Sequence, residues 1–312
     1  MKKNAILITT VLVVGSLLGL FVLKYGTLYE LDGNFSENSI NGGPPHVEVP
    51  QKIRLAAFNI QIFGKTKREK KEVVDVLVRV IREFDIVLVQ EIRDSSEETA
   101  PFFLDKINEM GTPLYGFVRS IRLGRSTSKE AYAYFFNTET IELIDGSDYV
   151  YNDVDDVFER EPYIASFRSG NFDFTLVGIH TKPDDASSEI EYLVGVIASL
   201  QADRYNEYDI VVMGDLNADG RYFDEGDASN HLRAQDYTWV IYDDMDTMIK
   251  TDYTYDRIIL LNSTYYHEYI MDSADVFYFD SVYNITDNEF LWDISDHYPV
   301  FAEFNTGLID DD

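Results

Sequence analysis

Short apolar runs along this chain each adjoin side chains that can do chemistry. Runs of this length are typical of strands buried in a sheet. The adjoining polar residues are Asn59 after Ile53–Phe58, Gln90 and Glu91 after Ile86–Val89, His180 after Phe174–Ile179, Asp215 and Asn217 after Ile210–Met213, and Asp296 and His297 before the run 299–304. One polar residue after a strand is usually a turn cap. Five such positions of one chemical character instead predict that the strand ends converge on a site at one edge of a sheet.

The apolar periodicity elsewhere predicts a mixed α/β domain. Apolar residues at helical spacing predict helices over 68–83, 97–110 and 188–205. Further apolar stretches predict strands at 131–136, 163–168, 172–179, 209–213, 257–261 and 299–304. Because strands and helices do not alternate strictly, the sheets are expected not to be purely parallel.

The N-terminal segment 1–26 carries a long uncharged run. Lys2 and Lys3 precede Ala5–Leu23, which Lys24 closes. At helical rise this run would span about 28 Å, close to the hydrocarbon thickness of a bilayer. An uncleaved membrane anchor is slightly favoured over a cleaved signal peptide, and both stay open. Either one places the rest of the chain outside the cytoplasm, secreted or at the cell surface, because basic residues at the start stay inside.

The residues after this segment fall into three predicted parts. Residues 27–50 are rich in Gly, Asn, Ser and Pro and are expected to form a flexible linker. The catalytic domain is expected over 51–306, followed by a short acidic tail at 307–312.

The acidic composition limits the partners and the chemistry. The net charge is −30, from 56 acidic and 26 basic residues, and there is no cysteine. Disulfides, thiolate zinc sites and cysteine nucleophiles are therefore excluded. Such a chain repels polyanions at long range, and salt screens the repulsion. The charge fits either a salty medium or carboxylates that serve divalent cations, and composition does not choose between them.

The polar residues at the strand ends suit metal-assisted hydrolysis of a phosphoester. Their hard oxygen ligands favour Mg²⁺, Mn²⁺ or Ca²⁺ over zinc, with Glu91 the best single ligand. Histidines transfer protons near neutral pH when a carboxylate fixes their tautomer. The set comprises the carboxylates Glu91, Asp215, Asp256 and Asp296, the amides Asn59 and Asn217, and the histidines His180 and His297.

These residues lie in longer strings that resemble the deoxyribonuclease I family of the endonuclease/exonuclease/phosphatase superfamily. The resemblance runs from about Ile53 to Phe304 and rests on the strings Leu55–Gly64, Val89–Ser95, Gly178–His180, Met213–Ala218, Tyr255–Ile258 and Ile294–Val300. Lys129-Glu130 and Arg160–Pro162 indicate the deoxyribonuclease I branch in particular. The resemblance implies a sandwich of two mixed β-sheets flanked by helices, acting as a monomer on DNA with Mg²⁺ or Mn²⁺ and, in addition, structural Ca²⁺.

The resemblance also implies a role for each site residue. The expected acid/base pair is His180, supported by Glu130, and His297, supported by Asp256. Asp215 and Asn217 complete the expected catalytic set. The metal ligands are expected to be Glu91, Asn59 and Asp296, the DNA contacts Arg93, Arg160, Arg125 and Thr66, and a structural calcium site Asp153, Asp156 and Glu161.

The chain departs from the family pattern at two places. Ser128 stands where the family usually has a tyrosine that packs into the DNA minor groove, so the cleavage preference is left open. The stretch Asp246–Thr251 resembles a second calcium loop but is about one residue short.

Basic residues form two islands in the sequence that are candidates for local contacts with a nucleic-acid backbone. The first island is Lys65, Lys67, Arg68, Lys70 and Lys71, and the second is Arg119, Arg122, Arg125 and Lys129. The first island is equally consistent with the solvated start of a helix.

Two alternatives keep the fold and change the function. A phosphoesterase acting on lipid head groups or inositol phosphates would share the Asp-Leu-Asn and Ser-Asp-His strings, and a membrane tether would suit it. A non-catalytic binding domain is disfavoured because every expected catalytic residue is present.

Overall fold

The computed structural model describes residues 51–125, 128–203 and 208–309. They belong to one compact unit, Glu48–Asp312. The expected hydrophobic segment 1–26, the linker 27–50 and residues 310–312 of the acidic tail lie outside the described residues. Within the described ranges, no helix has the length and apolar character needed to cross a membrane.

The first of two sheets has the strand order β12-β13-β1-β2-β4-β3. Only β1 and β2 pair in parallel, and every other neighbouring pair is antiparallel. Its strands are β1 (Lys52–Phe63), β2 (Ile86–Ile92), β3 (Tyr115–Arg119), β4 (Ala131–Asn137), β12 (Asp275–Val276) and β13 (Val300–Asn305).

The second sheet has the order β10-β11-β9-β8-β7-β5, and β6 also pairs with β7. Here β8 and β9 are parallel, whereas the other pairs are antiparallel. Its strands are β5 (Glu142–Leu143), β6 (Tyr149–Val150), β7 (Tyr163–Ser169), β8 (Phe172–Gly178), β9 (Ile210–Asp215), β10 (Tyr237–Trp239) and β11 (Asp256–Leu261). The prediction of two mixed sheets is confirmed.

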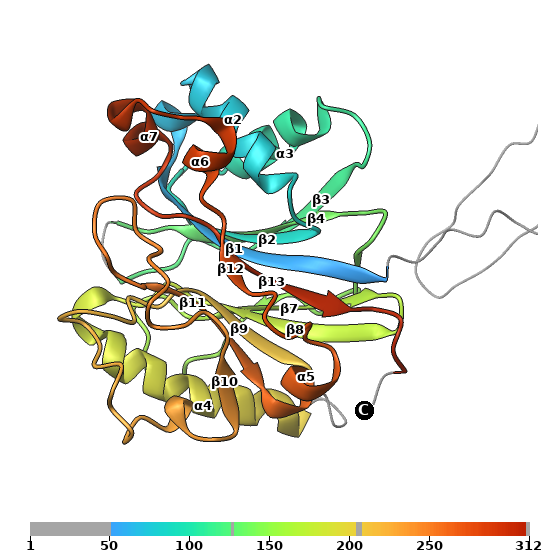
Figure 1. Ribbon diagram of the computed structural model, residues 1–312, viewed down its shortest axis with the longest axis vertical. Helices are drawn as coiled ribbons and strands as arrows, with labels where there is room; N and C mark the ends of the chain where they lie inside the picture. Colours follow the sequence, from blue (N-terminus) through green and yellow to red (C-terminus); the bar gives the residue numbers. More distant parts are fainter. Residues whose placement is uncertain (1–50, 126–127, 204–207, 310–312) are drawn as a thin grey trace, which may run out of the picture. The chain divides into compact units, whose positions relative to one another are not determined.

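The sheets pack face to face, with helices on both outer faces (Figure 1). The outer face of the first sheet carries α2 (Lys71–Ile81), α3 (Thr99–Asn108), α6 (Phe279–Tyr283) and α7 (Asn288–Ile294). The second sheet is covered by α4 (Ala186–Asp203). The remaining short helices are α1 (Lys65–Arg68), α5 (Asn262–His267), and the 3-10 turns η1 (Pro183–Asp185) and η2 (His231–Arg233).

Strand β9 shows why the sequence requires two layers of core. Successive strand residues point to opposite faces. Val211 and Met213 belong to the large core between the sheets, whereas Ile210 and Val212 belong to the core under α4. A strand that is apolar on both faces has to be covered on both sides, and for β9 the first sheet and α4 do this.

The predicted elements are found, with shifted bounds. The helix expected over 68–83 is α2 at Lys71–Ile81, and a break at Glu69–Lys70 separates it from the short α1, which shares only Arg68 with the prediction. The break leaves Lys67 buried, with its Nζ hydrogen-bonded to the carbonyls of Ile60 and Ile294. The elements that the sequence pattern did not predict are β3, the two- and three-residue edge strands, and α5 to α7, which are too short to show a clear period.

The strand ends that carry polar residues meet at one end of the sandwich rather than at one edge of a single sheet. The first sheet supplies Asn59, Glu91 and His297, and the second supplies His180 and Asp215. The tops of both sheets are therefore needed to build the site.

Candidate active site

Two buried histidine–carboxylate pairs form the centre of the site. Nδ1 of His180 lies 2.8 Å from Oε1 of Glu130, and Nδ1 of His297 lies 2.7 Å from Oδ2 of Asp256. All four side chains are almost inaccessible to solvent. A carboxylate on Nδ1 fixes the tautomer and leaves Nε2 as the nitrogen that can exchange a proton.

Both Nε2 atoms approach the same carboxylate oxygen. Oδ2 of Asp215 is 3.3 Å from Nε2 of His180 and 3.5 Å from Nε2 of His297. The same oxygen accepts a hydrogen bond from Nδ2 of Asn59 at 3.0 Å, and Oδ1 accepts from the backbone N–H of Asn217 at 3.0 Å. Two proton-transfer groups therefore flank one point, as an in-line displacement requires.

The charges of the site shift the pKa values of these groups. Burial disfavours the charged form of His297, yet the carboxylates of Asp256 and Asp215 outweigh it and raise its pKa to about 10. The pKa of His180 is also raised, because Glu130 and Asp215 outweigh burial. Burial alone would raise the pKa of Asp215, but the two imidazoles lower it.

Bulges at the ends of β1 and β2 aim Asn59 and Glu91 into the site. The pairing register between these strands shifts between Asn59 and Phe63, and the backbone of Glu91 has φ +60°. A positive φ at a non-glycine residue is strained and clusters at functional sites. The bulged backbone also holds the carboxylate, since Oε2 of Glu91 accepts the N–H of Ile62 at 2.8 Å.

The three expected metal ligands lie around this centre. Asn59 donates from Nδ2 to Oε1 of Glu91 at 3.3 Å, and Oδ1 of Asp296 is 3.8 Å from Nε2 of His297. The side chains of Glu91 and Asp296 are 12% and 25% exposed, so solvent reaches both carboxylates. Clustered hard oxygen atoms of this kind fit Mg²⁺, Mn²⁺ or Ca²⁺.

Among the described residues, two groups of carboxylates and imidazoles have ligand atoms within 4.8 Å of one another: Glu91, Glu130 and His180, and Asp215, Asp256 and His297. These groups contain four carboxylates, and that of Asp296 lies beside them, so five carboxylates are gathered here. A divalent cation would relieve their mutual repulsion, so the donor set fits such an ion.

Several supporting residues were not found from the sequence, because their contacts join distant segments. Thr247 is fully buried, and its hydroxyl accepts hydrogen bonds from the backbone N–H groups of Tyr255 and Asp256 at 3.0 and 3.2 Å. Its carbonyl accepts the N–H of Tyr298 at 2.7 Å. Thr247 thus holds the backbone of Asp256 and that of Tyr298, the residue that follows His297.

Lys67 is a second supporting residue whose role differs from the expected one. It was grouped with a solvated or nucleic-acid-binding island, but its ammonium is buried and joins the end of β1 to the end of α7. Burial lowers its pKa to about 8, against the opposing pull of Asp296 and Glu91. It braces the segment that carries Asn59 against the segment that carries Asp296.

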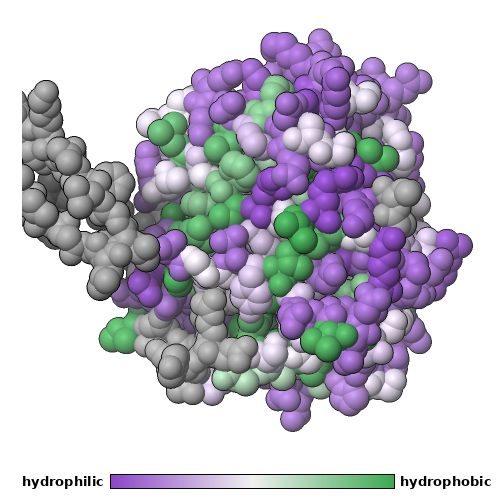
Figure 2. All heavy atoms as spheres, turned by 180° about the vertical axis from the view of Figure 1, so that it is seen from behind, coloured by the Kyte–Doolittle hydropathy of each residue, from purple (hydrophilic) through white to green (hydrophobic). Residues whose placement is uncertain are grey.

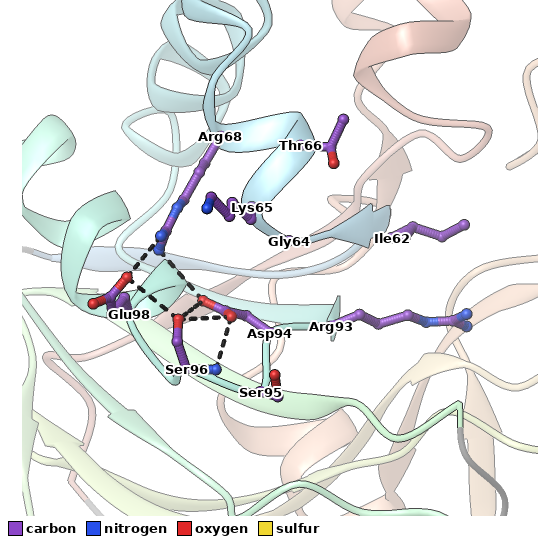
Figure 3. A pocket seen from close by; sticks show the side chains of 10 residues that line it. All are labelled: Ile62, Gly64, Lys65, Thr66, Arg68, Arg93, Asp94, Ser95, Ser96 and Glu98. Atoms are coloured by element: carbon purple, nitrogen blue, oxygen red, sulfur yellow. Dashed lines mark hydrogen bonds and ion pairs between the residues drawn. The ribbon is translucent and has the colours of Figure 1, made fainter.

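Arg93 and Thr66 lie at a pocket of about 440 Å³ beside the site. In Figure 3, Arg93 extends away from the network formed by Arg68, Asp94, Ser96 and Glu98. The Arg93 guanidinium is 26% exposed and lies 3.1 Å from Oε2 of Glu91 and 3.4 Å from Oε2 of Glu130. It therefore lies between the carboxylates of Glu91 and Glu130 and solvent.

The other two expected DNA contacts are placed differently. Arg160 is buried, and its Nε and Nη2 donate to the carbonyls of His180 and Thr181 at 2.9 and 2.8 Å. These bonds hold the backbone of His180 and Thr181 in place. Arg125 is 41% exposed and pairs with Asp156 at 3.0 Å.

The basic islands are partly neutralised by acids that are distant in sequence. In the first island, Arg68 pairs with Asp94 and Glu98, and Lys70 pairs with Asp293. In the second, Arg119 pairs with Glu97. The surface seen from behind is largely hydrophilic, with small scattered hydrophobic groups (Figure 2). Arg93 is also paired with carboxylates, but those carboxylates, Glu91 and Glu130, belong to the site itself, so Arg93 lies next to the two histidine–carboxylate pairs.

The expected structural calcium residues are close in sequence but engaged in separate contacts. Oδ2 of Asp153 accepts the N–H of Phe158 at 2.8 Å, and Asp156 pairs with Arg125. Glu161 is half-buried. A calcium ion at these residues stays a prediction.

The raised pKa of His297 predicts its protonation state in protein freed of divalent metal. Its imidazole should remain protonated through neutral pH and titrate near pH 10. Because the shift is upward, the ionised ring stabilises the folded protein fully below pH about 6.5, and this contribution is lost as the pH rises through about 10. An NMR titration of the imidazole nitrogens measures this directly, and a midpoint near 6.5 would contradict it.

Comparison with known proteins assigns the chain to a family. The model of the Endonuclease/Exonuclease/phosphatase family matches residues 56–297. Deoxyribonuclease gamma of Homo sapiens is 36% identical over 259 residues, covering 80% of this chain and 84% of that protein. Deoxyribonuclease-1 of Oryctolagus cuniculus is 35% identical over 265 residues, covering 81% and 93%.

Solved structures support the same fold. An endonuclease/exonuclease/phosphatase from Bacteroides vulgatus superposes with a TM-score of 0.57 at 17% identity, covering 82% of this chain and 99% of that one. The human Nocturnin catalytic domain gives 0.56 at 14% identity, covering 82% and 93%. Together with the sequence matches, these likenesses show that the chain belongs to the deoxyribonuclease I family within the endonuclease/exonuclease/phosphatase superfamily.

Proposed function

We propose that this protein is a divalent-metal-dependent endonuclease that hydrolyses phosphodiester bonds in DNA. The observation that carries the proposal is the convergence of two histidine–carboxylate pairs on one oxygen. His180 and His297 approach Oδ2 of Asp215 at 3.3 and 3.5 Å, each with a buried carboxylate on its Nδ1. This arrangement provides one proton acceptor and one proton donor at the same bond.

The chemistry needs the two histidines in opposite protonation states. One neutral imidazole accepts a proton from the attacking water through Nε2 while the water oxygen bonds to phosphorus. The other, as imidazolium, donates a proton from Nε2 to the leaving oxygen as its bond to phosphorus breaks. Neighbouring carboxylates raise the pKa of both rings, which suits the ring that acts as the acid. The ring that acts as the base must be neutral, so the negative charge around it has to be partly offset.

Glu91, Asn59 and Asp296, with Asp215, are the residues that would hold the cation. The carboxylates of Glu91 and Asp296 are 12% and 25% exposed, whereas that of Asp215 is buried and adjoins both histidines. When bound, a divalent cation supplies positive charge that stabilises the phosphoryl oxygens in the transition state and offsets the carboxylates beside the imidazoles. Asn217 and Asn59 keep Asp215 oriented by donating to its two oxygens.

DNA is the proposed substrate because the similar proteins are named deoxyribonucleases and because Arg93 offers a guanidinium at the rim. A planar guanidinium matches the oxygens of a phosphodiester. The whole chain has a net charge of −30 and repels DNA at long range, so binding depends on local contacts of this kind.

A plasmid-nicking assay with full-length protein tests the proposal. Nicking is expected with Mg²⁺ or Mn²⁺ and should stop with EDTA. His180→Ala and His297→Ala should each lower kcat by about 10²- to 10⁴-fold, because each removes a proton-transfer group.

The matched control for this assay is His231→Ala. His231 lies on η2, its side chain is 74% exposed, and its partner Glu191 is outside the site. Nicking by this variant should equal that of the wild type. The proposal fails if the wild-type protein leaves plasmid intact with either metal across a series of salt concentrations, and release of phosphocholine or inorganic phosphate instead would favour a lipid or inositol phosphoesterase.

We also propose that the hydrophobic segment Ala5–Leu23 exports the domain and tethers it to the outer side of a membrane. The support is the sequence alone, an uncharged run flanked by Lys2, Lys3 and Lys24. Cell fractionation should recover the protein in the membrane fraction, with its domain accessible to protease added outside. Recovery in the cytoplasm would contradict this.

A further inference from the structure

The guanidinium of Arg93 bridges two carboxylates of the site. Its Nη2 is 3.1 Å from Oε2 of Glu91 and 3.4 Å from Oε2 of Glu130. With His180, these carboxylates form one of the groups of described residues whose ligand atoms lie within 4.8 Å of one another. An arginine side chain stays protonated in proteins. Arg93 therefore supplies a positive charge to the same oxygens that could bind a metal ion.

The oxygen of Glu91 nearest to Arg93 already has a second partner. Oε2 accepts the N–H of Ile62 at 2.8 Å, whereas Oε1 accepts from Nδ2 of Asn59 at 3.3 Å. A Mg²⁺ ion on Oε2 would lie about 2.1 Å from that oxygen, and hence within about 5 Å of Nη2 of Arg93. Positive charges at this separation repel strongly where the surroundings are partly buried. A divalent cation and the guanidinium would therefore compete for Oε2.

Arg93 is held less firmly than two other cations near the site. Its Nη1 donates to the hydroxyl of the exposed Ser128 at 3.0 Å, and its side chain is 26% exposed. By contrast, Arg160 and Lys67 are buried and donate to backbone carbonyls. In Figure 3, Arg93 extends away from the acidic network of the neighbouring pocket. Its guanidinium can therefore change position without breaking the contacts that hold the backbone of the site.

We propose that Arg93 competes with the divalent cation for Glu91, so that it lowers the cation affinity of the free protein and is released toward the phosphodiester when the cation binds. The proposal rests on the proposed function, in which Glu91 holds the cation, and adds a coupling between the cation and the substrate. The cation takes over the charge of the carboxylate, and the released guanidinium faces the phosphate oxygens as a planar fork. Because such coupling is reciprocal, a bound phosphodiester also tightens cation binding.

A titration of the full-length protein with Mn²⁺, followed by the EPR signal of the free ion, tests the competition without catalysis. NaCl in the buffer screens the acidic surface and weakens binding elsewhere. Arg93→Met removes the charge and should bind Mn²⁺ about 5- to 150-fold more tightly than the wild type, the usual range for coupling between two sites. Arg93→Lys keeps the charge and should bind Mn²⁺ much as the wild type does.

Two further substitutions identify the ion that is measured and control for charge. Glu91→Gln should remove the tight class of Mn²⁺, and adding Arg93→Met to it should not restore tight binding. Arg168→Met is the matched charge control, because Arg168 is 51% exposed and pairs with Asp173 at the end of β8 away from His180. Its affinity for Mn²⁺ should equal that of the wild type.

The competition is overturned if Arg93→Met, shown by thermal unfolding to be folded, binds Mn²⁺ no more tightly than the wild type, or if Arg168→Met tightens binding equally. Arg93→Gln, which also removes the charge, decides in the same way if Arg93→Met does not fold. Unchanged Mn²⁺ affinity in Arg93→Met with plasmid nicking by the wild type would leave the proposed function standing. Unchanged affinity in Glu91→Gln would contradict both the proposed metal site and the competition.

Discussion

A buried amide joins the two sheets at the end where the site lies. Gln90, at the end of β2 in the first sheet, donates from Nε2 to the carbonyl of Ile179 at 2.6 Å and accepts the N–H of Asp215 at 2.9 Å. Both partners belong to the second sheet or its end. The side chain is completely buried, and an unpaired buried amide would cost about 1–3 kcal/mol. Gly214, with φ +136°, leaves room for this contact, because a Cβ would collide with the Gln90 side chain and with Ile179.

This connection explains how the two halves of the site keep their spacing. Asn59 and Glu91 belong to the first sheet, whereas His180 and Asp215 belong to the second. The bonds of Gln90, together with the hydrogen bond from Asn59 to Asp215, join the two halves and hold the acid/base groups at fixed distances.

The strand-end residues could be predicted because the signal is local. An apolar run and the polar residue that ends it are adjacent in sequence, so Asn59, Glu91, His180 and Asp215 were found from the residues themselves. Glu130 was found only through the family resemblance, since the sequence gives no sign of its contact with a histidine fifty residues later. Thr247 was not found from the sequence, because its role depends on bonds to residues on two other segments.

Charged residues were the least predictable part. The sequence shows Lys67 among other basic residues, but only the fold brings two backbone carbonyls to its ammonium. Arg160 is likewise placed by the carbonyls of His180 and Thr181. Short elements such as β12 and α6 were missed because two to five residues do not establish a period.

If the two histidines act as one unit on a single phosphate, removal of either should already remove nearly all of their joint contribution. The direct measurement is kcat for plasmid nicking by His180→Ala, His297→Ala and the double variant. The double variant should retain about the same activity as the slower single variant, because groups that act together are strongly non-additive. Losses that multiply in the double variant would contradict a shared centre at Asp215.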